Sequence, residues 1–157
     1  LGLRRIEVAR LVLGDIDWRG GTVTVTGKAG ARDRLPLPGD VGEAIAGYAA
    51  GGRPRDMGEA VFFTVVPPIK PITPTVVSVV VRAAGVRCGM EPFGPHRLRH
   101  TLGCEMLRAG AGLEAVGQVL RHKDLSSTSV YAKIDTARLG LLALPWPSAG
   151  SGGSVDL

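Results

Sequence analysis

The chain has 157 residues, of which 45% are hydrophobic, and it carries a formal net charge of +5. This length suits one folded domain with its own core, and the composition excludes an intrinsically disordered chain. The basic charge makes nucleic acid a candidate partner, and because no run of about 18 apolar residues occurs, we expect no membrane span.

The cysteines and the start of the chain give two further expectations. Cys88 and Cys104 fit neither a metal-ligand pair nor a disulfide framework, so we expect both to be reduced, in a cytoplasmic protein. The chain starts at Leu1 directly on a helical pattern and shows no signal-peptide pattern. We therefore expect the chain to be N-terminally incomplete.

The first part of the chain shows one helical pattern followed by a hairpin pattern. Apolar residues recur at helical spacing over 3–13, and Gly14 is expected to end this helix. The TVTVT of 22–26 alternates with period two, and a turn-rich stretch separates it from the RLPLP of 34–38. This pattern predicts a β-hairpin with Lys28 near its tip.

The middle of the chain predicts two helices and a short strand between them. We expect Asp40 to cap a helix that runs to about residue 50, and we expect a short strand over 61–66. The β-branched run of 73–86 favours a strand by propensity, but its length and its Thr-Pro start favour a helix. We therefore predict a helix there.

The last part of the chain is predicted to be helical and to end in a tail. Helices are expected over 95–109, over 112–121 and over 127–135, with a Gly/Ser-rich flexible stretch at 148–155. Taken together, the patterns predict a mainly α domain with a small antiparallel β-sheet.

A His/Arg pair on the helix of 95–109 is one candidate for chemistry. His96 and Arg99 are three residues apart, so a helix presents them on one face. For an arbitrary pair at this spacing, however, a solvated basic helix end is the favoured explanation. Metal binding by His96 and His100 is disfavoured. Arg97 stands where metalloprotease helices carry Glu, and arginines repel a cation.

Other polar residues also have simple structural explanations when taken one at a time. Tyr131 could pack half-buried with its hydroxyl at the surface, and Lys28 could be a solvated turn residue. Arg4 could pair with Glu7 on the same helix face.

The order and spacing of these residues resemble the tyrosine recombinase (phage integrase) family. GLRRIEV resembles its first arginine box, TVTGKAGARDRLPL its β-hairpin, HRLRHT its second box and VLRHKDLSSTSVYAKID its last. These segments carry the set Arg4, Glu7, Lys28, His96, Arg99, His122 and Tyr131. The resemblance implies the DNA breaking-rejoining enzyme fold for a catalytic domain over 1–147, with 148–157 as a flexible C-terminal tail.

The family's chemistry implies roles for most of this set. Tyr131 would attack a DNA phosphodiester and form a 3′-phosphotyrosyl link, and His96 is the candidate acceptor of its proton. Arg4 and Arg99 would grip the phosphoryl oxygens with paired hydrogen bonds.

The remaining members of the set would assist that step. The resemblance assigns Lys28 as general acid for the departing 5′ oxygen, and His122 would donate a hydrogen bond to the phosphate. Glu7 would orient Arg4 or Lys28. The scheme needs no metal ion and no nucleotide cofactor.

The resemblance also implies double-stranded DNA as partner and a homo-tetramer on two paired DNA sites. Basic residues beside the motifs are plausible phosphate contacts, which give affinity rather than sequence choice: Arg32, Arg34, Arg97, Arg121 and Lys123.

Two departures leave alternatives open. The family's upstream DNA-clamping domain does not precede Leu1, and Arg121 stands where the family commonly has glycine. A truncated remnant that binds DNA without cutting it is therefore one alternative. A type IB topoisomerase is another, although the GLRxxE and HxLRH boxes favour a recombinase.

Overall fold

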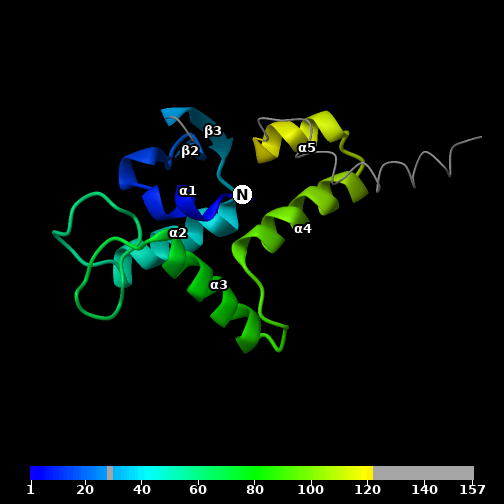
Figure 1. The fold of residues 1–157 in the computed structure, drawn as a ribbon. Helices are drawn as coiled ribbons and strands as arrows, with labels where there is room; N and C mark the ends of the chain where they lie inside the picture. Colours follow the sequence, from blue (N-terminus) through cyan, green and yellow to red (C-terminus); the bar gives the residue numbers. More distant parts are fainter. Residues whose placement is uncertain (28–29, 122–157) are drawn as a thin grey trace, which may run out of the picture.

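The computed structural model describes residues 1–27 and 30–121, and within them the chain is mainly helical with one three-stranded antiparallel sheet (Figure 1). In chain order the elements are α1 (Arg5–Arg10), the 3-10 helix η1 (Leu13–Asp15), β1 (Ile16–Asp17), β2 (Thr22–Thr26), β3 (Arg32–Pro36), α2 (Gly39–Gly51), α3 (Pro74–Arg87), α4 (Pro95–Arg108) and α5 (Leu113–Leu120). The predicted fold class is confirmed.

The predicted hairpin is formed by β2 and β3. Val23 of β2 lies opposite Leu35 of β3 and, on its other side, opposite Ile16 of β1. Val23 and Val25 are buried while the threonines between and beside them are partly exposed, which is the alternation that TVTVT predicts. The expected position of Lys28 near the tip lies outside the described residues.

Helix α1 is shorter than its periodicity predicts, and Gly14 does not end it. The helix stops at Arg10 because the chain turns extended at Leu11, whose carbonyl accepts a hydrogen bond from the backbone N–H of Val61 at 2.9 Å. Gly14 lies within η1 instead. A pairing with a distant segment therefore overrides the helical pattern, and it buries Leu11 in the core.

Helix α2 starts before the expected cap. Pro38 occupies the cap position and its carbonyl accepts a hydrogen bond from Gly42 at 2.9 Å, so Asp40 lies inside the first turn. The prediction of Asp40 as the cap was wrong, although a carboxylate in a first turn still complements the helix dipole.

The strand expected over 61–66 does not form. Two isolated bridges take its place, Val12 with Ala60 and Phe63 with Pro71. Prolines follow at 67, 68 and 71, and because proline has no N–H to donate, they prevent a continuous ladder.

The predicted helices of the second half are confirmed as α3, α4 and α5. At the start of α3, the Thr73 hydroxyl accepts a hydrogen bond from the backbone N–H of Val76 at 3.4 Å, with Pro74 at the first helical position. This cap stabilises the start of the helix and explains why the β-branched segment forms a helix rather than a strand. The helix expected over 127–135 and the tail at 148–155 lie outside the described residues.

Two apolar clusters form the core. The first lies between α1, the sheet and α2, and the second, smaller one lies between α4 and α5; their buried members are Leu11, Ile16, Val23, Ile45 and Val61, and Leu107, Val116 and Leu120, respectively. In Figure 1, α5 lies beside the C-terminal part of α4, and the start of the chain lies between the two groups of elements. Among the residues that the structure describes, no helix is long and apolar enough to cross a bilayer.

Candidate active site

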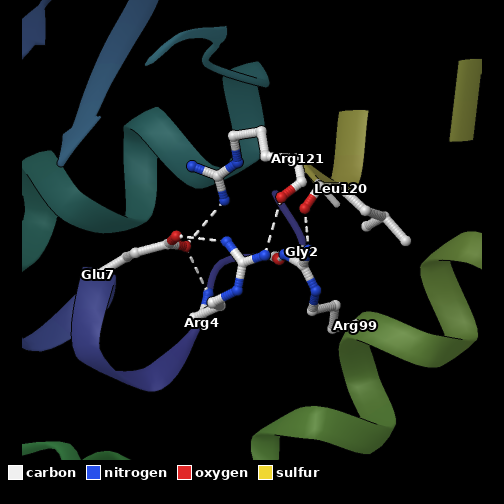
Figure 2. A network of polar contacts seen from close by, with 6 residues as sticks. All are labelled: Gly2, Arg4, Glu7, Arg99, Leu120 and Arg121. Atoms are coloured by element: carbon white, nitrogen blue, oxygen red, sulfur yellow. Dashed lines mark hydrogen bonds and ion pairs between the residues drawn. The ribbon is translucent and has the colours of Figure 1, made fainter. Parts of the chain in front are cut away.

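Two of the predicted catalytic arginines meet at the end of α5. Arg4 stands at the N-cap of α1, and Arg99 lies in the second turn of α4. Figure 2 shows both guanidinium groups reaching the backbone of Leu120 and Arg121. The start of α1 therefore meets α4 and the end of α5, two elements that are distant from it in sequence.

The first contact within the group is local to α1. Glu7 accepts a hydrogen bond from the backbone N–H of Arg4 at 2.7 Å on Oε2 and one from Arg4 Nη1 at 2.9 Å on Oε1. The carboxylate thereby binds a backbone N–H at the helix start and holds the Arg4 side chain at the same time. Glu7 is buried, whereas the Arg4 side chain is 40% exposed.

The second set of contacts uses neighbouring carbonyl groups at the end of α5. The Leu120 carbonyl accepts a hydrogen bond from Arg99 Nη2, and the Arg121 carbonyl accepts one from Arg4 Nη2 at 2.8 Å. Arg99 Nη1 donates to the Gly2 carbonyl at 2.6 Å. Carbonyls at a helix C-terminus carry partial negative charge and lack helical partners, so cationic donors stabilise them.

Arg121 joins the group through its side chain as well as its carbonyl. Its backbone is left-handed, with φ 53° and ψ 49°, and its Nη2 donates to Glu7 Oε2 at 2.8 Å. Its side chain is only 9% exposed. Among the described residues its buried Nε and Nη1 find no acceptor.

The charges around Glu7 keep its carboxylate ionised. Burial on its own would raise the pKa of Glu7, but hydrogen bonds from the Arg4 backbone and side chain, with the charges of Arg121 and Arg4, outweigh it. The net pKa lies below the usual value of 4.5. At neutral pH the ionised Glu7 carboxylate therefore accepts hydrogen bonds from two guanidinium groups, those of Arg4 and Arg121.

The other predicted catalytic residues lie apart from this group or outside the described residues. His96 is exposed in the first turn of α4, one turn before Arg99. Lys28, His122 and Tyr131 are among the residues that the structure does not describe.

The arginines predicted to contact DNA differ in their surroundings. Arg32 pairs with Asp15 at 3.3 Å, and Arg34 pairs with Asp17 at 2.7 Å; both arginine side chains are about two-thirds exposed, at 65% and 63%. Arg97 is exposed, and its guanidinium lies 5.7 Å from the centre of the Phe93 ring. Lys123 lies outside the described residues.

The potential metal ligands of α4 form a different contact. His100 Nε2 lies 3.6 Å from Cys104 Sγ, one turn later on the helix. Over 1–27 and 30–121, no group of three or more His, Cys, Asp or Glu side chains could hold a metal ion.

Sequence reasoning missed the part of the site that the end of α5 supplies. The two carbonyl acceptors carry no sequence signal, because every residue has one. The ion pair of Arg121 with Glu7 joins residues at opposite ends of the described chain. The available signal was an arginine in a place where a helix end favours glycine.

Comparison with known proteins gives a consistent result at the levels of family, sequence and fold. The profile of the phage integrase family matches residues 1–138. "Putative integrase/recombinase y4rA" of Sinorhizobium fredii is 47% identical over 150 residues, which is 94% of this chain and 36% of that protein. "Tyrosine recombinase XerC" of Pseudomonas putida is 36% identical over 141 residues, which is 88% of this chain and 46% of that protein.

Among solved structures, the fold is similar to that of XerH site-specific recombinase bound to a palindromic difH substrate in a post-cleavage complex. The TM-score is 0.72 at 20% identity, over 90% of this chain and 41% of that chain. This chain thus spans less than half the length of each of these three proteins.

Proposed function

Because the chain belongs to the phage integrase family, we propose that its residues 1–147 are the catalytic domain of a site-specific DNA recombinase or integrase. It would cleave and rejoin DNA through a 3′-phosphotyrosyl intermediate. The observation that carries the proposal is the meeting of Arg4 and Arg99 at neighbouring carbonyls of α5. Two guanidinium groups held close together suit an oxyanion of a phosphodiester.

The proposed reaction is a substitution at phosphorus. The Tyr131 phenol oxygen forms a bond to the phosphorus, and the bond to the 5′ oxygen breaks. His96 accepts the phenol proton and Lys28 supplies a proton to the leaving oxygen, so charge and atoms balance. A 5′ hydroxyl of another strand then reverses the step and releases Tyr131.

The arginines would stabilise the charge that builds on the phosphoryl oxygens during this substitution. Arg4 has the more exposed side chain of the two, so it is the guanidinium that a DNA phosphate reaches first. Arg99 and His122 would complete the set of donors, and Glu7 would hold Arg4 in place. Roles for Lys28, His122 and Tyr131 rest on the sequence motifs that carry them.

We further propose double-stranded DNA as the partner, in the cytoplasm, with four copies assembled on two paired sites. Phosphate contacts are proposed at Arg32, Arg34, Arg97 and Lys123, which lie beside the motifs. The sequence predicts Arg121 among them as well, but its side chain is 9% exposed and bound to Glu7, so no phosphate contact is proposed for it. Such contacts make affinity fall steeply with salt without choosing a sequence.

Covalent capture tests the proposal without knowledge of the DNA site. The wild-type chain and its Tyr131→Phe variant are incubated with a pool of short, nicked duplexes of randomised sequence, and adducts are scored on a denaturing gel. We expect an adduct with wild type and none with the variant, and sequencing of the trapped strands would identify the site.

Failure would take one of two recognisable forms. Equal signals from both proteins, together with salt-sensitive retention of DNA, would mean that this chain binds DNA without cutting it. Relaxation of a supercoiled plasmid without strand exchange would instead favour a type IB topoisomerase.

A further inference from the structure

We infer that Arg121 is a positioning residue for Arg4: its carbonyl and, through Glu7, its side chain fix the Arg4 guanidinium and leave the site positively charged. The inference rests on the proposed function for its meaning in the reaction. The contacts themselves can be tested without it.

The first step concerns the backbone at the end of α5. In the left-handed conformation of Arg121, its carbonyl accepts from Arg4 Nη2 at 2.8 Å while its side chain contacts Glu7. A right-handed residue here would continue the helix and direct the same carbonyl elsewhere. The unusual backbone conformation is therefore what lets one residue contact both members of the Arg4–Glu7 pair (Figure 2).

The second step concerns the ring of contacts that results. Arg4 donates to Glu7 Oε1 at 2.9 Å, Arg121 donates to Glu7 Oε2 at 2.8 Å, and the Arg121 carbonyl accepts from Arg4. Arg4 is thus held by hydrogen bonds from two directions. A long side chain that is 40% exposed would otherwise move among several rotamers.

The third step is electrostatic. Glu7 is ionised and neutralises the charge of Arg4, so without Arg121 the group of Arg4, Glu7 and Arg99 would carry a net charge of only +1. The addition of Arg121 raises this net charge to +2, from three guanidinium groups and one carboxylate. Arg121 therefore restores the positive charge that Glu7 removes.

The geometry favours this role over direct contact with DNA. The Arg121 side chain is 9% exposed, its Nη2 is bound to Glu7, and its Nε and Nη1 are buried. Arg4 is the more accessible guanidinium of the two. A phosphate would contact Arg4 directly and would also be attracted by the nearby positive charge of Arg121.

The Glu7 carboxyl provides a test that does not depend on catalysis. Its pKa is measured by carbon-detected NMR titration in the full chain, for wild type, Arg121→Gly and Arg121→Lys. Glycine suits the left-handed backbone, so Arg121→Gly removes the side chain while keeping the helix end. The matched control is Arg108→Met, which removes a cation from the exposed pair with Glu105 on α4.

We expect the pKa of Glu7 to rise in Arg121→Gly, to rise less in Arg121→Lys and to stay unchanged in Arg108→Met. An unchanged pKa in Arg121→Gly would mean that the ion pair does not form in solution and would overturn the inference. If wild type traps no DNA, the proposed function fails while this titration still decides the role of Arg121.

The second measurement separates positioning from DNA contact. Covalent-complex formation is timed at saturating DNA with the nicked duplex pool, and affinity for one short duplex is measured at several salt concentrations in the Tyr131→Phe background. Arg121→Gly should slow cleavage by about 100-fold, as expected for a misplaced catalytic group. Arg121→Lys should recover part of the rate, and Arg108→Met should cleave as wild type.

Because Arg121 adds charge near the phosphate without contacting it, Arg121→Gly should weaken affinity for the duplex only slightly and should leave the salt slope unchanged. Suppose instead that Arg121→Gly cleaves at the wild-type rate at saturating DNA and that the salt slope of its DNA affinity falls by about one. Arg121 would then be a phosphate contact, and the positioning role would be overturned.

Discussion

The arginines of the β-sheet and those between α1, α4 and α5 both bind oxygen atoms, but in different surroundings. On the sheet, Arg32 and Arg34 pair with aspartates while staying about two-thirds exposed, at 65% and 63%. Between the helices, Arg99 is buried and the Arg121 side chain is only 9% exposed. The two groups share one type of interaction but differ in contact with water.

Burial decides what each group can do. Exposed ion pairs contribute between zero and about 1 kcal/mol and are screened by salt, so a DNA phosphate can replace Asp17 as the partner of Arg34 at little cost. Asp15, the partner of Arg32, is itself buried. When a buried charge loses its partner, no water molecule takes the partner's place, so breaking such a contact lowers the stability of the fold far more. Arg34 on the sheet therefore suits reversible contact, and the interhelical arginines suit fixed geometry.

The largest effect is expected at Arg99. Arg99→Met removes charge-assisted hydrogen bonds to the Gly2 and Leu120 carbonyls, so the free energy of unfolding should fall by about 4 kcal/mol. Urea denaturation measures the change. Arg97→Met, on the same helix but exposed, is the control and should stay within about 0.5 kcal/mol of wild type. Equal small losses in both variants would contradict the contrast.

The next largest effect is expected at Glu7. Glu7→Gln leaves the Arg4 and Arg121 guanidinium groups facing each other without a counter-charge, so stability at neutral pH should fall by about 3 kcal/mol. The control is Glu105→Gln, which removes the carboxylate from the exposed pair with Arg108. A loss at Glu7 no greater than that at Glu105 would mean that burial does not strengthen the network.

A smaller effect should follow from acidification. The pKa of Glu7 is lower in the folded chain than its usual 4.5, so its stabilising contribution is complete above the unfolded-state value and is lost as pH falls through the folded pKa. Thermal denaturation of wild type should therefore show a loss below about pH 4.5 that Glu7→Gln lacks. Parallel pH profiles for the two proteins would contradict this.

The smallest effect on stability is expected at the sheet. Arg34→Gln removes an exposed pair with Asp17, so the free energy of unfolding should change by no more than about 0.5 kcal/mol. If Arg34 contacts a phosphate, the salt slope of DNA affinity should fall by about one. Filter binding at several salt concentrations measures it. An unchanged slope would remove Arg34 from the DNA-contacting surface.

How far the sequence predicts the fold depends on whether an element is held by local or by distant contacts. The Thr-Pro start of α3 and the alternation in β2 are local signals, and both elements form where they are predicted. Helix α1 ends early because Leu11 pairs with Val61, a contact that no local pattern encodes. The strand expected over 61–66 is replaced by isolated bridges because of the prolines that follow it, and these prolines are visible in the sequence.

The candidate site divides in the same way. Spacing within motifs singled out Arg4, Glu7 and Arg99, and the Arg4–Glu7 pair three residues apart is present. No local pattern predicts the contact of Arg121 with Glu7, because that contact depends on where the end of α5 lies relative to α1. Catalytic roles for the predicted set stay predictions that the experiments above can test.

The two neighbouring carbonyls at the end of α5 have a consequence for folding. Arg4 and Arg99 come together only after the first residues of the chain and the end of α5 have met, which closes nearly the whole described length into one loop. Contacts of such long sequence separation form late and are lost when one of the elements that hold them opens locally. Local opening of α5 would disperse both guanidinium groups at once, so hydrogen exchange at the end of α5 would report directly on the fraction of molecules with an assembled site.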